Sequence, residues 1–192
     1  MDPQAWLNKY GDALFRFAYV RVRDRAAAED LVSETLLAAL KKADSFRGEA
    51  SEKTWLTGIL KHKVLDYLRT RFRTVSADAE DDLASVDERG FEPEGEWSGH
   101  WASSQLPTDW GRNPQELMER REFWNTFNQC LSTLPERTAA LFALHVMDGL
   151  SSEELCNDFG ISQTNLRVLL YRARKQLRDC LEQHWKKTEN GL

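Results

Sequence analysis

The chain has 192 residues, of which 41% are hydrophobic, and its formal net charge is −5. This length allows one or two small domains with apolar cores, and no apolar run approaches the roughly 20 residues that span a membrane. The net negative charge argues against a nucleic-acid-binding protein, unless the charges are distributed unevenly along the chain.

Residues 3 to about 73 are predicted to be helical, because their apolar residues recur three or four positions apart without any alternating strand pattern. The first helix is marked by Leu7, Tyr10, Leu14 and Phe17. A second helix is expected from Asp24 to Lys42, with Asp24 as its N-cap. The segment 44–52, DSFRGEASE, then interrupts the pattern with a glycine and turn-forming residues. A third helix is expected from about Lys53 to Phe72, with an inward face of Trp55, Leu56, Ile59, Leu60, Val64 and Leu68.

The second and third helices carry two different surfaces. The sequence AEDLVSETLLAAL, residues 28–40, gives an acidic and apolar face that suits docking to the helices of another protein. The next segment interleaves aromatic residues with a basic series: Arg47, Lys53, Lys61, Lys63, Arg69, Arg71 and Arg73. This pattern suits single-stranded DNA, because bases stack on rings while cations neutralise phosphates. The alternative is that Trp55 and Tyr67 are core residues and the charges only solvate a helix; we favour the core for Trp55 and DNA for the basic series.

Residues 75 to about 112 are predicted to form an acidic, flexible linker, because they contain Gly, Pro, Ser and acidic residues without a sustained apolar period. Between residues 76 and 116, eleven acidic residues stand against two arginines, so the rest of the chain carries a net positive charge. The objection from overall charge therefore does not apply to the two ends. Three tryptophans, Trp97, Trp101 and Trp110, are unusual in a solvated linker; contact with a partner and packing against the chain's own helices both remain open.

A second helical unit is predicted from about Pro114 to Trp185. Asn113-Pro114 is a plausible helix start, and the first helix is amphipathic through Leu117, Phe123, Trp124, Phe127 and Leu131. Another helix is expected to open at Leu134-Pro135-Glu136 and to end near Gly149.

The remaining segment, from Asp148 to Trp185, predicts a helix-turn-helix. Ser151 and Glu154 form a capping box, Gly160 allows a sharp turn, and Ser162 is a good N-cap for the second helix. That helix has one buried stripe: Leu166, Leu170, Ala173 and Leu177.

Polar and basic residues lie off this stripe: Gln163, Thr164, Arg167, Val168, Tyr171, Arg172, Arg174 and Lys175. Their geometry suits a DNA major groove, where N-terminal side chains of a recognition helix meet base edges and later arginines hold phosphates. The alternative is a helical hairpin with a solvated charged face. We favour DNA contact, because the capping box, the glycine turn, the N-cap and the basic face coincide.

The chemistry-bearing residues do not indicate an enzyme. The sequence has no Gly-rich phosphate loop, no paired carboxylates facing a plausible cleft, and four scattered histidines, of which His145 is expected to be packed. Its three cysteines are an odd number at wide spacing, which indicates reduced thiols in a cytoplasmic protein. Cys180 and His184 share a helical face, as a metal pair would, but no second pair lies nearby in the sequence. We therefore expect no metal and no cofactor. The N-terminus, MDPQAW, also lacks the features of a secretory signal.

Three blocks, in this order, resemble the extracytoplasmic-function (ECF) group of bacterial sigma factors. DLVSETLLAAL is similar to the family's core-polymerase-binding helix, and FRGEASEKTWLTGILKHKVLDYLR to its promoter-melting and −10-recognition segment. LSTLPERTAALFALHVMDGLSSEELCNDFGISQTNLRVLLYRARKQL is similar to its −35-binding domain, including the RAR triplet at 172–174. The resemblance implies an all-α fold of two small helical domains, residues 1–74 and 114–192, joined by a long acidic linker, residues 75–113.

The resemblance also implies site residues. Core polymerase would be bound through Asp30, Leu31, Glu34, Thr35 and Leu36. The −10 element would be bound through Phe46, Arg47, Lys53, Trp55, Lys61, His62, Lys63 and Arg69, with an unpaired base held by the 44–53 loop and the following helix. The −35 duplex would be bound through Ser162, Gln163, Thr164, Asn165, Arg167, Val168, Tyr171, Arg172, Arg174 and Lys175.

The implied function is a promoter-specificity subunit that binds the clamp helices and flap of RNA polymerase core and both duplex and single-stranded promoter DNA. An anti-sigma partner is also implied. Three features depart from the family: His62 stands where many relatives have Asn, Val168 and Leu169 replace polar or basic residues, and the linker is long and acidic. A stand-alone helix-turn-helix regulator is the main alternative, and a helical adaptor that binds only protein is a third.

Overall fold

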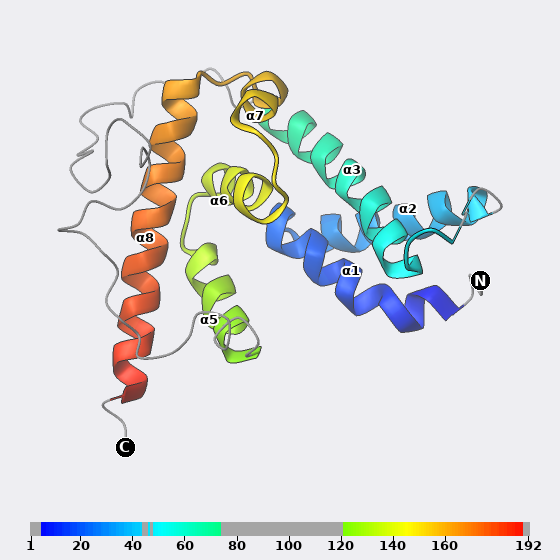
Figure 1. Ribbon diagram of the computed structural model, residues 1–192, viewed down its shortest axis with the longest axis horizontal. Coiled ribbons are helices and arrows are strands. Elements are labelled where there is room, and N and C mark those ends of the chain that lie inside the picture. The colour runs from blue at the N-terminus through cyan, green and yellow to red at the C-terminus, as the bar shows by residue number, and fades with distance from the viewer. Residues whose placement is uncertain (1–4, 44–45, 47, 74–120, 190–192) are drawn as a thin grey trace. The chain divides into compact units, whose positions relative to one another are not determined.

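The computed structural model describes residues 5–43, 46, 48–73 and 121–189, with side chains described as far as His184. Within these ranges the chain is helical and contains no strand (Figure 1), so the predicted all-α class is confirmed. Arg47, the linker at 75–113 with its tryptophans, and the predicted helix start at Pro114 lie outside the described residues. The chain divides into two compact units: Met1–Ala77 with Pro135–Gln163, and Asp78–Leu134 with Thr164–Leu192.

The first unit contains three mutually packed helices: α1 (Trp6–Val22), α2 (Arg25–Lys41) and α3 (Glu52–Arg73). Asp24 caps α2 as predicted, because its carboxylate accepts a hydrogen bond from the backbone N–H of Ala27 at 3.0 Å. The core is built from fully buried side chains that recur at helical spacing: Leu14, Ala18, Val22, Ala28, Leu56, Leu60, Val64 and Leu68. Trp55 and Ile59, also expected to face inward, are only half-buried.

Three further elements complete the first unit: α6 (Glu136–Phe142), the π-helix η5 (Ala143–Met147) and α7 (Ser152–Phe159). The α6 and η5 elements contact α1, and α7 contacts α3. The single helix predicted from Pro135 to Gly149 is therefore an α-helix that widens into a π turn, where the backbone N–H of Asp148 bonds the carbonyl of Ala143. His145 is half-buried and its Nδ1 lies 2.8 Å from the carbonyl oxygen of Leu150.

A buried ion pair joins α1 to the end of η5. Arg21 donates from Nε and Nη2 to the two carboxylate oxygens of Asp148, at 2.7 and 2.5 Å. It also donates from Nη1 to the carbonyl of Phe17 and lies 3.4 Å from the centre of the Phe17 ring. Both side chains of the pair are only 5% exposed. Since an isolated buried charge is very unfavourable, each of these two residues makes the burial of the other possible.

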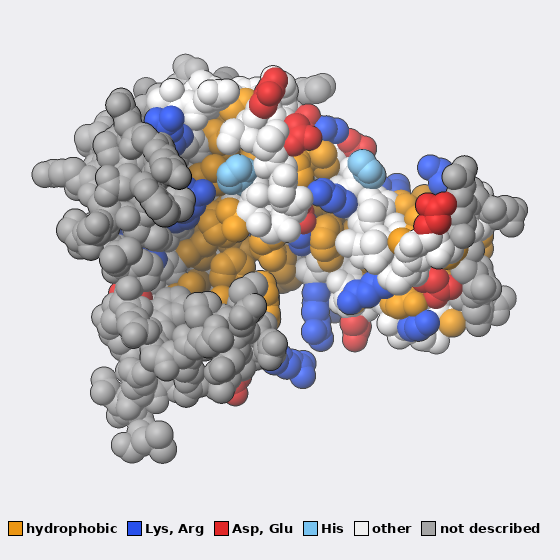
Figure 2. All heavy atoms as spheres, viewed as in Figure 1, with side chains coloured by type: hydrophobic (Ala, Val, Ile, Leu, Met, Phe, Trp, Pro, Cys, Tyr) orange, Lys and Arg blue, Asp and Glu red, His pale blue; other side chains and the backbone are white. Residues whose placement is uncertain are grey.

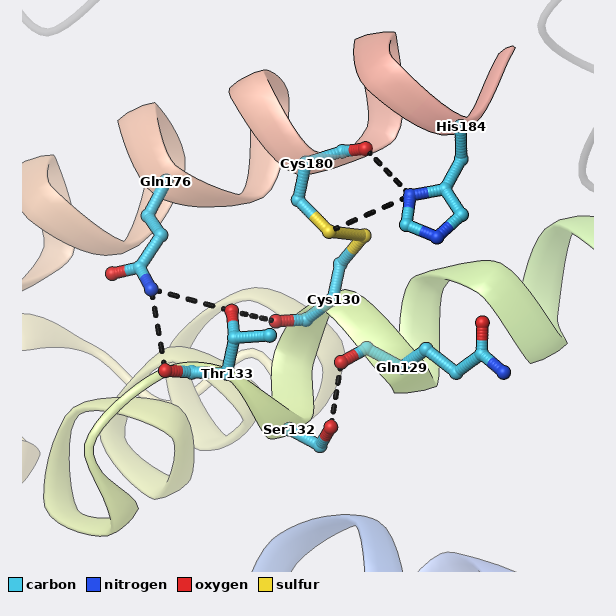
Figure 3. The surroundings of a disulfide bond; sticks show 7 residues. All are labelled: Gln129, Cys130, Ser132, Thr133, Gln176, Cys180 and His184. Atoms are coloured by element: carbon cyan, nitrogen blue, oxygen red, sulfur yellow. Dashed lines mark hydrogen bonds between the residues drawn. A yellow bond between two sulfur atoms is a disulfide. The ribbon is translucent and has the colours of Figure 1, made fainter. Parts of the chain in front are cut away.

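The second unit contains α5 (Arg121–Ser132) and most of α8 (Gln163–Glu189). The predicted stripe of α8 is confirmed, since its four residues, Leu166, Leu170, Ala173 and Leu177, are all buried. A disulfide between Cys130 on α5 and Cys180 on α8 joins the two helices (Figure 3). The prediction that all three cysteines are reduced is therefore wrong for this pair, and only Cys156 is free. The fifty-residue separation concealed the pairing, because it depends on how the two helices pack.

Two glycines provide a matched test of the turn. Gly160, after α7, has φ +61°, a conformation that L side chains rarely adopt, whereas Gly58 lies inside α3 with open space around its Cβ position. We expect Gly160→Ala to destabilise the chain by about 1–2 kcal/mol and Gly58→Ala to stabilise it by up to about 1 kcal/mol. Urea unfolding of both variants checks this, and equal effects of the two substitutions would contradict it.

Candidate functional site

The helix-turn-helix segment has the predicted local structure. The Ser151 hydroxyl accepts from the backbone N–H of Glu154 at 3.2 Å, and the Glu154 carboxylate accepts from the backbone N–H of Ser151 at 2.7 Å. This is a complete capping box at the start of α7. Gly160 then adopts the left-handed conformation, and the backbone N–H of Ile161 bonds the carbonyl of Cys156. α8 follows directly from Gln163.

The capping box makes a pH-dependent contribution to stability. Hydrogen bonds from the backbone N–H and then the hydroxyl of Ser151 lower the pKa of Glu154 below its ordinary value of 4.5. Because the folded-state pKa is lowered, the stabilisation is complete above pH 4.5 and is lost as the pH falls through the lowered pKa. Glu154→Ala should therefore destabilise the chain at pH 7 and progressively less in acid. Glu153→Ala, one residue away and exposed, is the control for loss of a first-turn charge. In urea unfolding at pH 7 it should lower the free energy of unfolding by less than Glu154→Ala does.

The residues predicted to face the DNA groove differ in exposure along α8. Five are exposed: Ser162, Gln163, Thr164, Arg167 and Lys175. Four are partly buried: Asn165, Tyr171, Arg172 and Arg174. Burial lowers the pKa of the Arg174 guanidinium below its ordinary value. Val168, which belongs to the predicted −35 set, is only 6% exposed, so its side chain is not accessible to DNA in this conformation: α8 is covered on a second side, beyond its main stripe.

The acidic and apolar face of α2 also differs from the prediction in which residues are exposed. Asp30 and Glu34 are exposed as predicted and Leu36 is half-buried, but Leu31 and Thr35 are buried. Those two residues follow the inward period of α2, and the Thr35 hydroxyl donates to the carbonyl of Leu31 at 2.7 Å. They therefore cannot contact another protein in this conformation.

Two exposed leucines that were not predicted complete this face. Leu37 and Leu40 are among the few large hydrophobic side chains exposed on the described part of the chain. Leu37 lies three positions after Glu34 and so shares its side of the helix, a spacing that was readable in the sequence. We call Asp30, Glu34, Leu37 and Leu40 the α2 face.

An aromatic cluster lies where the loop meets α3. The ring of Trp55 lies 5.0 Å from that of Phe46 and 5.9 Å from that of Trp6, centre to centre. Trp6 is buried, while Phe46 and Trp55 are half-buried. Trp55 thus packs against the buried ring of Trp6, while part of its own side chain remains accessible to solvent. Lys53 and His62, from the same predicted −10 set, are exposed.

Three further cations of the −10 set that the structure describes are bound to acceptors within the first unit. Lys61 donates to the carbonyl of Asp148 at 2.9 Å, Lys63 pairs with Glu34 at 2.7 Å, and Arg69 pairs with Asp158 at 2.7 Å. The pair with Asp158 raises the pKa of Arg69 above its ordinary value. On the face shown in Figure 2, blue and red side chains accordingly lie beside one another over the described helices. The predicted basic surface is therefore partly neutralised in this conformation.

Known protein families match the chain over two segments, one N-terminal and one C-terminal. Residues 6–74 match the family described as Sigma-70 region 2, and residues 125–177 match Sigma-70, region 4. A probable RNA polymerase sigma factor from Haemophilus influenzae is 36% identical over 91% of this chain and 87% of its own length. The ECF RNA polymerase sigma factor SigX from Bacillus subtilis is 26% identical over 93% of this chain and 83% of its own length. The chain belongs to the ECF group of RNA polymerase sigma factors.

A solved structure is similar to this sigma factor as well: the sigma factor RpoE in complex with the anti-sigma factor NepR from Bartonella quintana. It is 24% identical, with a TM-score of 0.42, and the match covers 92% of this chain and 94% of that one. The region 2 match contains the α2 face and the aromatic cluster, and the region 4 match contains the helix-turn-helix of this sigma factor. None of the described helices is long and apolar enough to cross a membrane.

Proposed function

We propose that this sigma factor binds RNA polymerase core through the α2 face, opens and holds the −10 element through Phe46, Trp55 and the α3 cations, and reads the −35 element through α8. The segments that we assign to these steps are the two predicted domains, residues 1–74 and 114–192, joined by the linker at 75–113. Within the second of them, residues 135–163 belong to the same compact unit as residues 1–77. The chain itself is not an enzyme, since RNA synthesis is the chemistry of the polymerase. It acts in the cytoplasm, and an anti-sigma factor covers its polymerase-binding surfaces.

The α2 face supports the polymerase step. Two carboxylates, Asp30 and Glu34, border two exposed leucines. Exposed apolar side chains with a polar rim are typical of helix-docking surfaces. The clamp helices of the polymerase are the partner that we assign to it. Lys63 pairs with Glu34 in the free chain, so docking would exchange this contact for one with the clamp.

The aromatic cluster supports the melting step. Phe46 and Trp55 offer ring faces on which an unpaired base can stack, and Lys53 is an exposed cation for the adjacent phosphate. A surface that binds the base only when it is unpaired shifts the duplex towards the open state, against an unpairing free energy of a few kcal/mol per base. His62, exposed on α3 between Lys61 and Lys63, is the residue that we propose selects that base.

The start of α8 supports −35 recognition. Gln163, Thr164 and Arg167 are exposed in its first turns, where a recognition helix meets base edges. Gln pairs bidentately with adenine and Arg with guanine, and each such pair contributes about 1–3 kcal/mol of discrimination. Lys175 is exposed further along α8 and is the residue that we assign to a phosphate.

Run-off transcription with purified core polymerase on a genomic promoter library tests this function. Arg167→Ala should lower transcription from promoters with the matching −35 element by about 5–150-fold, the equivalent of one bidentate contact. Arg25→Ala is the matched control and should have little effect, because Arg25 is an exposed arginine on α2 that pairs with Glu29. Tight binding of the isolated chain to a palindromic duplex, with no stimulation of core polymerase, would instead support a stand-alone regulator.

A further inference from the structure

The disulfide between Cys130 and Cys180 has no part in the proposed function. Cys130 is near the end of α5 and Cys180 is on α8, with 5.7 Å between their Cα atoms. The helices are also joined one turn away, where Gln176 donates to the carbonyl and hydroxyl of Thr133, both at 3.2 Å (Figure 3). This second contact between α5 and α8 does not depend on the sulfur–sulfur bond.

The two sulfur atoms are not equivalent. Cys130 is fully buried, whereas Cys180 is half-buried and has a histidine beside it. The exposed His184 has its Nδ1 3.0 Å from the carbonyl oxygen of Cys180 and 3.9 Å from its sulfur (Figure 3). A cationic imidazole next to a sulfur stabilises the thiolate, which is the reactive form of cysteine. The accessible sulfur is thus the one with an activating neighbour.

We propose that Cys130 and Cys180 are a peroxide-oxidisable thiol pair, in which Cys180 reacts with the oxidant and Cys130 completes the disulfide. This inference rests on the proposed function in one respect: a protein that works with cytoplasmic RNA polymerase is in a reducing compartment, where a disulfide is formed transiently by an oxidant.

The reaction has two balanced steps. The Cys180 thiolate attacks one oxygen of hydrogen peroxide, the O–O bond breaks, and sulfenic acid and hydroxide are formed. The Cys130 thiol then attacks the Cys180 sulfur, and the new S–S bond displaces the sulfenic oxygen, which leaves as water with the Cys130 proton. One peroxide is reduced and two thiols are oxidised. Two equivalents of a cellular thiol reduce the Cys130–Cys180 disulfide by successive exchange and are themselves oxidised to a disulfide.

Cys156 is an internal control for this assignment. It is on α7, it has no cysteine partner, and burial raises the pKa of its thiol. It should therefore remain a thiol at peroxide concentrations that oxidise the pair.

Mass spectrometry of the reduced full-length chain, treated with hydrogen peroxide and digested, tests the proposal without polymerase or DNA. A negative result therefore leaves the proposed function untouched. We expect loss of about 2 Da and a single 130–180 cross-linked peptide that dithiothreitol removes. The Cys156→Ser variant should behave identically. Absence of the cross-link, or oxidation of Cys156 at the same rate, would overturn the proposal.

Single-cysteine variants test the order of the two steps. With Cys130→Ser, dimedone should label Cys180; with Cys180→Ser, Cys130 should remain unlabelled because it is buried. The reverse pattern would overturn the assignment. In the Cys130→Ser background, His184→Gln should slow labelling several-fold, and added imidazole should restore it, which a purely structural role would not give.

The last experiment distinguishes the thiol pair from a zinc site. Such a site is the alternative because the possible ligand atoms of Cys130, Cys180 and His184 lie within 4.8 Å of one another. The reduced chain is incubated with one equivalent of Zn²⁺ before peroxide is added. Unchanged cross-linking supports the thiol pair. Tight binding of one zinc that abolishes the cross-link would overturn it in favour of a metal centre.

Discussion

Arg21→Ala is expected to lower the free energy of unfolding of the first unit by about 3–5 kcal/mol, the usual effect of removing one partner from a buried ion pair. The reason is that the Asp148 carboxyl group would remain at a site only 5% exposed, without the two hydrogen bonds that now satisfy it. Urea unfolding followed by circular dichroism measures the loss. Hydrogen exchange should rise in η5, the element that precedes Asp148.

The matched control for Arg21→Ala is Arg25→Ala. Arg25 is 80% exposed and pairs with Glu29 within α2, so its removal should change stability by less than about 1 kcal/mol. Replacing both partners together, as Arg21→Met with Asp148→Leu, should recover much of the loss, because no uncompensated charge remains. Equal effects of the two single substitutions would show that the 21–148 pair is not buried in solution.

Leu37→Asp is expected to weaken binding to core polymerase by roughly 30-fold or more, the effect of losing an interface residue that contributes at least about 2 kcal/mol. Leu37 is 60% exposed and lies on the α2 face beside Glu34, so aspartate would remove the apolar contact and add a third carboxylate. The folded chain should be unaffected. Binding of labelled variants to purified core, measured by fluorescence anisotropy, gives the affinity.

Leu7→Asp is the control for Leu37→Asp, because Leu7 is 61% exposed and lies on α1, outside the α2 face. Its affinity for core should match that of the unaltered chain. Thr35→Ala should also leave affinity nearly unchanged, since Thr35 is buried. A loss of affinity with Leu7→Asp or Thr35→Ala similar to that with Leu37→Asp would contradict the assignment of the α2 face.

Local features of this protein were predictable from sequence because their causes are local. The cap at Asp24, the capping box at Ser151 and the turn at Gly160 each depend on residues within a few positions, and all three occur as predicted. The buried stripe of α8 follows from helical spacing in the same way.

Features that depend on distant contacts were missed. Nothing near Val168 in the sequence indicates that a second side of α8 is covered. The short stretch at 30–37 mixes two faces of one helix, so similarity to a family motif did not separate buried Thr35 from exposed Leu37. The disulfide and the Arg21–Asp148 pair join residues 50 and 127 positions apart, and no local rule predicts either.

The long separation of Arg21 and Asp148 has a consequence during synthesis of the chain. At roughly 5–20 residues per second, a ribosome adds Asp148 some 6–25 s after Arg21, a gap of 127 residues. α1, α2 and α3 are complete well before then, so they collapse around a guanidinium that still lacks its counter-ion. We therefore expect the nascent N-terminal helices to pack less tightly until the later segment supplies Asp148. Chaperones and proteases would encounter that looser state on every newly made molecule.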